Sequence, residues 1–163
     1  MFNDKYGLTA AVLGRKKTCT RRLMSYGDAY RYQIGEVIAV AQNYKELLDK
    51  GFLVDDEHLT LSNSPGYKNK MFVKSELMQK HIRITGVRME RLQEISDEDC
   101  MKEGVLSSDK YAMPYGIPTC DGVFFYYSTP REAFADLIDK VSGRGTWDSN
   151  PTVAVYDFEL VEK

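Results

Sequence analysis

The stretch Ala11-Val12-Leu13-Gly14-Arg15-Lys16-Lys17-Thr18-Cys19-Thr20-Arg21-Arg22 decides how the rest of the chain is interpreted. Apolar residues at positions 8, 11 and 12 recur at helical spacing and predict a helix over residues 5–14. The segment that follows, residues 15–22, contains five cations and no acid. We expect it to continue as a loop or strand. Cations near a helix C-terminus are favoured by the helix dipole, so part of this charge has a structural reason.

A second segment, residues 94–103, has the opposite character, with five acids and one lysine. Ser96 is a predicted N-cap, acids fill the first turn after it, and Gly104 is a predicted C-cap, which together indicate a short helix. Glu103 falls in the last turn of that helix, where a carboxylate opposes the dipole. We therefore expect Glu103 to be kept there for a reason other than helix stability.

Further elements indicate an α+β fold. β-Branched residues predict strands over residues 36–42, 81–92 and 152–160. A clear helix begins at Thr129, where Thr-Pro-Arg-Glu supplies an N-cap, a proline in the first turn and a capping-box Glu132. Its apolar face predicts that Phe134, Leu137 and Ile138 are core residues. Strands outside the helices favour a barrel or curled sheet with helices attached.

The composition fits one ordinary domain spanning residues 1–163. Hydrophobic residues make up 43% and charged residues 28% of the chain, which is typical of a globular protein rather than a disordered one. The net charge of −2 argues against a wholly basic nucleic-acid coat. The sequence has no apolar run of the roughly 18 residues that a membrane span needs and no signal-peptide pattern, so we expect a cytoplasmic protein without a membrane partner.

Three cysteines, Cys19, Cys100 and Cys120, are too dispersed for a zinc knuckle and odd in number for a disulfide framework, so reduced thiols are expected. Asp55, Asp56, Glu57 and His58 contain metal-ligating groups, but consecutive residues rarely all face one ion. We expect no metal site and no cofactor.

Two long connections, residues 45–68 and 105–128, exceed typical loop lengths, and such loops are often functional. The second contains six aromatic residues: Tyr111, Tyr115, Phe124, Phe125, Tyr126 and Tyr127. They can stack on bases, but the favoured interpretation is a buried strand over residues 123–127 with the others packing in the loop.

The stretch quoted first resembles the opening signature of ASCH domains, in which a helix leads into a lysine, a threonine three residues later and then an arginine. The glycine usually found two residues before that lysine is displaced by one position, to Gly14. Further motifs follow in family order, at residues 69–73, 83–87, 90–96, 99–104 and 145–151. Together they resemble the longer ASCH proteins of phages and of bacterial chromosomes with phage-like regions, over most of the chain except the two long loops.

This resemblance implies a PUA-like fold, a small β-barrel with flanking helices and a cleft, and a superfamily associated with RNA binding and with reading modified bases. The first expectation for function is therefore a domain that binds RNA or a modified nucleoside in a cationic cleft. Arg21, Arg22, Lys70 and Trp147 are the candidate ligand contacts. Salt bridging for Arg22, solvation for Lys70 and anchoring of the last strand by Trp147 remain the structural alternatives.

The second expectation is an amidohydrolase. A compact bacterial branch of the ASCH group is implicated in removing the acyl group from N4-acetylcytidine with a Lys, a Thr and a Glu, and the matching positions here are Lys17, Thr20 and Glu103. A threonine hydroxyl needs a neighbouring base before it can act as a nucleophile. A solvated basic loop, and a phage-associated protein-interaction domain with a vestigial cleft, are the remaining alternatives.

Overall fold

The computed structural model describes residues 2–25, 27, 29–55, 60–109 and 112–162. Its α-helices and β-strands, in chain order, are α1 (Leu8–Leu13), β1 (Cys19–Leu23), β2 (Val37–Ala39), α2 (Tyr44–Asp49), β3 (Lys80–Arg91), α3 (Asp97–Lys102), β4 (Leu106–Ser107), β5 (Tyr115–Pro118), β6 (Phe124–Tyr127), α4 (Pro130–Ser142), α5 (Thr146–Ser149) and β7 (Thr152–Glu162). Short 3₁₀ helices occupy Leu61–Asn63, Pro65–Tyr67, Lys70–Phe72, Ser75–Leu77 and Leu92–Glu94.

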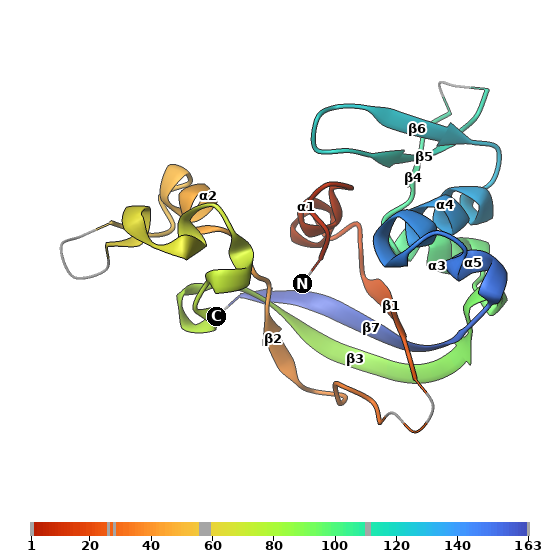
Figure 1. Cartoon of the computed structure of the whole chain (residues 1–163), viewed down its shortest axis with the longest axis horizontal. Coiled ribbons are helices and arrows are strands. Elements are labelled where there is room, and N and C mark those ends of the chain that lie inside the picture. The colour runs from red at the N-terminus through yellow and green to blue at the C-terminus, as the bar shows by residue number, and fades with distance from the viewer. Residues whose placement is uncertain (1, 26, 28, 56–59, 110–111, 163) are drawn as a thin grey trace.

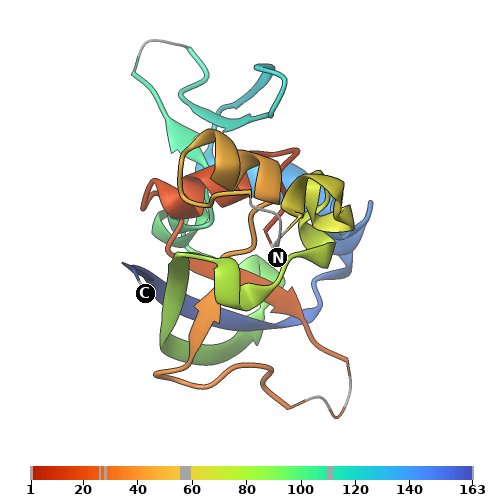
Figure 2. The same cartoon turned by 90° about the vertical axis from the view of Figure 1, so that its left-hand side faces the viewer.

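Two antiparallel sheets organise the molecule. The larger has the strand order β1-β7-β3-β2, and the smaller has the order β4-β5-β6. Figures 1 and 2 show α1 lying between the two sheets, with α2 and its neighbouring 3₁₀ helices forming a lobe to one side. The α+β class is therefore confirmed. The expected closed barrel is not seen, because among the described residues the larger sheet ends at β1 on one side and at β2 on the other.

The long β3–β7 pair is the backbone of the larger sheet (Figure 1). Its register shifts between Ile84 and Gly86, which marks a β-bulge. A side chain at Gly86 would meet the carboxylate of Asp157, since an added Cβ would lie 3.0 Å from its Oδ2. The bulge lets Ile82 and Ile84 face the core on one side of it while Arg88 and Glu90 face a charged cluster on the other.

Helix α4 closes the core as its pattern predicted. The Thr129 side chain accepts a hydrogen bond from the Glu132 backbone at 3.1 Å, and the Glu132 carboxylate accepts one from the Thr129 N–H, so the capping box is present. Phe134, Leu137 and Ile138 are buried, in a cluster that joins α4 to α3, β5 and β7. The predicted core face of this helix is confirmed.

The aromatic segment after residue 122 differs from its prediction. Residues 124–127 do form a strand, but Phe125 and Tyr126 are exposed. β6 is the outermost strand of the small sheet, and the side chains of the neighbouring residues Phe125 and Tyr126 point to opposite faces of that sheet. Lys140 of α4 covers part of this surface, with its ammonium 4.0 Å from the centre of the Phe125 ring. Tyr111 lies outside the described residues.

Within the described part of the chain, no helix has both the length and the apolar character needed to span a membrane.

Candidate functional site

The turn after α1 brings the basic segment onto the acidic helix. The backbone N–H groups of Lys16 and Lys17 both donate to the carbonyl of Ala11, at 2.8 and 3.0 Å. Arg15, between the helix and these residues, has a φ of 58°, the left-handed conformation that glycine adopts most easily. Thr18 then donates its N–H to the carbonyl of Lys102 at 2.9 Å, so β1 starts in direct contact with the end of α3.

Lys17 and Glu103 form a buried ion pair at this junction. The Lys17 side chain is 1% exposed and that of Glu103 is 6% exposed. The ammonium of Lys17 also donates to the backbone carbonyls of Cys19 and Glu103, each at 2.8 Å. An ammonium has three N–H donors, and these two carbonyls and the Glu103 carboxylate use all of them. The pair is therefore fully hydrogen-bonded on the lysine side.

Arg21 continues the charged cluster away from this pair. Its guanidinium, with a side chain 0% exposed, donates to Glu90 at 2.6 Å, to Asp99 at 2.9 Å and to Glu103 at 3.3 Å. Burial lowers the pKa of Arg21, but Glu103 and the hydrogen bonds to Asp99 and Glu90 outweigh it and raise that pKa. The charged guanidinium thus links three carboxylates through ion pairs.

Arg88 extends the cluster to the bulge in β3. Its guanidinium pairs with Asp99, Asp157 and Glu90. Charges of alternating sign therefore run from Lys17 through Glu103, Arg21 and Asp99 to Arg88. Sequence analysis did not identify Arg88, Glu90 or Asp99 as part of this cluster. The available signal was the alternation on β3, where two charged residues flank the exposed Met89.

A cavity of about 450 Å³, here called the β1 cavity, lies beside these groups. Its lining consists of Phe2, Asn3, Leu8, Lys17, Thr20, Arg21, Arg22, Leu23, Glu103, Phe134, Leu137, Ile138, Val141 and Ser142. The structure thus brings Lys17, Thr20 and Glu103 together, along with Arg21 and Arg22. Its lining combines apolar residues of α4 with the Lys17–Glu103 pair and residues of β1.

Thr20 and Arg22 lie two residues apart on β1 and so share one face of the strand. Both also line a smaller cavity of about 50 Å³, whose lining includes Tyr156. The Thr20 hydroxyl makes no hydrogen bond to any of the described residues. The salt bridge to the acidic helix that was considered for Arg22 is made by Arg21.

Lys70 and Trp147 are not among the described residues that line the β1 cavity. Lys70 donates to Asp4 at 2.6 Å, to Thr9 at 2.9 Å and to the carbonyl of Phe2, so it fixes the N-terminal segment. The Trp147 ring packs edge-on against Phe134, with its centroid 6.1 Å away, and lies under the Arg131 guanidinium. Both partners of the Trp147 ring belong to α4.

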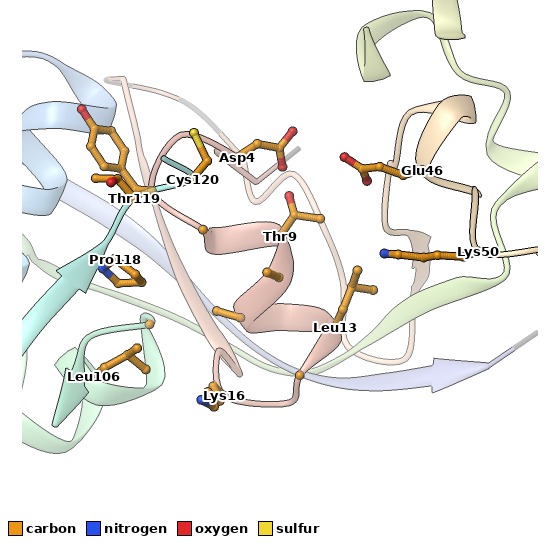
Figure 3. A pocket seen from close by; sticks show the side chains of 16 residues that line it. Asp4, Thr9, Leu13, Lys16, Glu46, Lys50, Leu106, Pro118, Thr119 and Cys120 are labelled. Carbon is orange, nitrogen blue, oxygen red and sulfur yellow. The ribbon is translucent and has the colours of Figure 1, made fainter. Parts of the chain in front are cut away.

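A larger cavity of about 610 Å³ lies along the other side of α1 (Figure 3) and is here called the α1 groove. Small residues of α1 line it, and Figure 3 shows Glu46 of α2 and Lys50, the residue after α2, extending toward α1. The groove contains none of the candidate site residues. The acids at its rim already have partners, because Asp4 pairs with Lys70 and Glu46 accepts from Asn43 at 2.7 Å. The β1 cavity, which most of the candidate residues line, is therefore the candidate site despite its smaller volume.

The cysteines add no nucleophile to the β1 cavity. Cys19 and Cys100 are free and buried, and Cys120 is free and exposed in the α1 groove. Burial, with the charge of Glu103, raises the pKa of the Cys19 thiol, and burial raises that of Cys100 to about 12. Both thiols are protonated near neutral pH, and a protonated thiol is a poor nucleophile.

Among the described residues, no group of three His, Cys, Asp or Glu side chains is placed to hold a metal ion. Asp55 instead accepts the backbone N–H groups of Leu61 and Ser62, at 2.7 and 3.0 Å. The other members of that acidic run, residues 56–58, lie outside the described residues.

Comparison of the chain with protein-family models, with curated proteins and with solved structures finds no match.

Proposed function

We propose that this protein binds a nucleoside, free or within RNA, in the β1 cavity. The observation that supports this most is the pairing of an apolar wall, formed by Phe134, Leu137 and Ile138, with a polar wall formed by Thr20, Arg22 and the Lys17–Glu103 pair. Small-molecule sites are typically apolar cavities of about 300–1,000 Å³ with a few convergent polar groups. We propose that a planar base lies in this cavity with one face against α4 and its polar edge toward β1.

The ordered motifs that resemble ASCH domains support the same proposal, because the PUA-like superfamily is associated with RNA and modified bases. The charge distribution points to a local rather than a general nucleic-acid surface. The chain has a net charge of −2, and the cations Lys17 and Arg21 are already paired with buried carboxylates. We therefore propose that a nucleoside is the unit recognised, and that phosphate contacts contribute little to its affinity.

Hydrolysis of an N4-acylated cytidine is the second candidate function, and the position of Thr20 favours it. Its hydroxyl lacks a described partner and lines the same cavity as Lys17 and Glu103. In this reaction the hydroxyl oxygen adds to the acyl carbon, the C–N bond breaks, and the amine leaves with the hydroxyl proton. Water then hydrolyses the threonine ester, releasing the carboxylic acid and restoring Thr20.

We rank nucleoside binding above hydrolysis because of the hydrogen bonds that Lys17 already makes. All three donors of the Lys17 ammonium are in use, so neither Lys17 nor the Glu103 oxygen paired with it is available as a proton acceptor in this arrangement. Hydrolysis requires one of these bonds to break when substrate enters. Binding of a nucleoside requires no such change.

Titration calorimetry with cytidine and N4-acetylcytidine, together with chromatography of the same mixtures, tests both candidates. Saturable binding without product supports the binding function, and release of cytidine from N4-acetylcytidine supports the hydrolase. Thr20→Ala separates them further: it abolishes hydrolysis while leaving binding largely intact if the hydroxyl is a nucleophile. Absence of both heat and product at millimolar nucleoside contradicts the proposal.

A further inference from the structure

The inference concerns the outer edge of β1, which faces the β1 cavity. In the larger sheet β1 pairs only with β7 among the described residues, so it is an edge strand. An edge strand has one row of backbone N–H and C=O groups that its neighbour does not use. The register with β7 determines which residues these groups belong to.

The Phe158 N–H donates to the carbonyl of Thr18 at 2.8 Å, and the Met24 N–H donates to the carbonyl of Thr152 at 3.2 Å. Both contacts follow the register of the β1–β7 pair. In an antiparallel ladder hydrogen-bonded and non-hydrogen-bonded residues alternate along each strand. Thr20, Arg22 and Met24 therefore direct their backbone groups toward β7, as does the carbonyl of Thr18, whose N–H donates to Lys102 instead. Cys19, Arg21 and Leu23 direct theirs outward.

The start of this outward edge is already occupied. The carbonyl of Cys19 accepts a hydrogen bond from Lys17 at 2.8 Å. The N–H and C=O groups of Arg21 and Leu23 have no hydrogen-bond partner among the described residues, and both residues line the β1 cavity. Arg21 is 5% exposed, and unpaired backbone groups at so buried a residue are rare, so its free groups along the cavity mark a place for a ligand or for water.

We infer that the free edge of β1 at Arg21 and Leu23 recognises the polar edge of a nucleobase. This inference rests on the proposed function and specifies how the base is held. The edge presents donors and acceptors in alternation, and a base such as cytosine presents a donor, its amino group, beside an acceptor, its N3. The free stretch is too short for an added peptide strand, because Lys17 occupies the carbonyl of Cys19, which precedes it on the outward edge.

A proline at position 23 tests the inference in the protein. Leu23 is 47% exposed at the end of an edge strand, and its N–H points away from β7. Proline is tolerated where the missing N–H faces away from the sheet, so Leu23→Pro removes one outward donor and leaves the ladder intact. Leu23→Ala is the matched variant, since it also loses the side chain but keeps the N–H.

The measurement is the dissociation constant for cytidine or N4-acetylcytidine, whichever binds wild type more tightly. We expect Leu23→Pro to bind about tenfold more weakly than Leu23→Ala, the loss of roughly one hydrogen bond. Equal affinities of the two variants would overturn the inference and leave the proposed function standing. If wild type binds neither nucleoside, the proposed function fails and this inference fails with it.

A set of ligands provides a second test of the inference, which uses the wild-type protein and does not depend on the folding of Leu23→Pro. N4,N4-Dimethylcytidine lacks the amino donor of cytidine, whereas 5-methylcytidine keeps both the donor and N3. We expect wild type to bind the dimethyl compound about tenfold more weakly than cytidine and to bind 5-methylcytidine with similar affinity. Equal binding of cytidine and the dimethyl compound would overturn the inference even if the proline variant does not fold.

Discussion

The ammonium of Lys17 donates to the backbone carbonyl of Glu103 at 2.8 Å and forms an ion pair with its carboxylate. The two residues are 86 positions apart in the chain. This contact ties the basic segment after α1 to the end of α3, and the β1 cavity lies against it. The carboxylate at the unfavourable end of α3 therefore has a specific partner. That partner explains why an acid occupies this position.

The first prediction concerns the stability of this pair. Removing one member of a buried ion pair leaves the other charge uncompensated, so Lys17→Met and Glu103→Gln should each destabilise the protein by about 3–5 kcal/mol. The double variant should lose less than the sum, with an interaction energy of about 0.5–3 kcal/mol. Urea unfolding of the four proteins measures both quantities, and additive losses would show that the two side chains act independently.

Acid should destabilise the protein through Asp99. Partial burial raises the pKa of its carboxyl, but Arg21, with Arg88 and Lys102, outweighs this and holds the pKa below its usual 3.8. The unfolded state therefore takes up the proton first. The stability that Asp99 contributes is present above about pH 4 and is lost as the pH falls through the folded-state pKa.

Unfolding free energies measured between pH 6 and pH 3 check this prediction. Wild type should lose more stability over that range than Asp99→Asn, which is less stable at pH 6 but has no carboxyl to protonate. Asp97→Asn is the matched control, because it removes an exposed carboxylate from the same helix but outside the cluster. A wild-type profile parallel to that of Asp99→Asn would contradict the role given to Asp99.

The backbone conformation at Arg15 predicts that glycine and alanine have opposite effects on stability at positions 15 and 16. Arg15 has a φ of 58°, whereas Lys16 beside it is not among the residues of positive φ. A left-handed conformation costs a residue with a Cβ roughly 1–2 kcal/mol relative to glycine. Arg15→Gly should therefore be more stable than Arg15→Ala, while Lys16→Gly should be less stable than Lys16→Ala. Thermal unfolding of the four variants compares the two pairs, and the same order at both positions would contradict this turn.

The core face of α4 is tested at Leu137, which is 3% exposed. Replacing it with Ala should cost about 2–5 kcal/mol, since the cavity left behind adds to the lost burial. The exposed Ser142, on the same helix, provides the control, because Ser142→Ala should change stability by less than about 0.5 kcal/mol. A loss below about 0.5 kcal/mol for Leu137→Ala would show that this face is not core.

Local signals predicted the elements that depend on neighbouring residues. The capping box at Thr129 and the N-cap at Ser96 are both present, since these contacts span only three residues. The strands after residues 80 and 151 also follow their β-branched pattern. Strand β2 is shorter than its pattern suggested: its ladder with β3 covers Val37–Ala39, and backbone hydrogen bonds to β3 follow on either side, at Glu36 and Val40.

Contacts between residues far apart in the chain could not be predicted from the sequence. The ion pairs of Arg21 join it to Glu90 and Asp99, which come close to it only in the folded chain. Lys70 reads as an isolated surface charge, and its contacts with Asp4 and Thr9 appear only when the chain has folded back on its N-terminus. The free edge of β1 is likewise a property of strand order, on which the periodicity of a single strand carries no information.

The central claim is that a nucleoside binds in the β1 cavity. It is tested most directly by filling each of the two cavities in turn and measuring the affinity for N4-acetylcytidine by titration calorimetry. Ser142 lines the β1 cavity, Ala10 lines the α1 groove, and both residues are exposed, so a tryptophan at either position should leave the core intact. We predict that Ser142→Trp weakens binding at least tenfold and that Ala10→Trp binds like wild type. Binding lost in Ala10→Trp and kept in Ser142→Trp would place the ligand in the α1 groove and contradict the account.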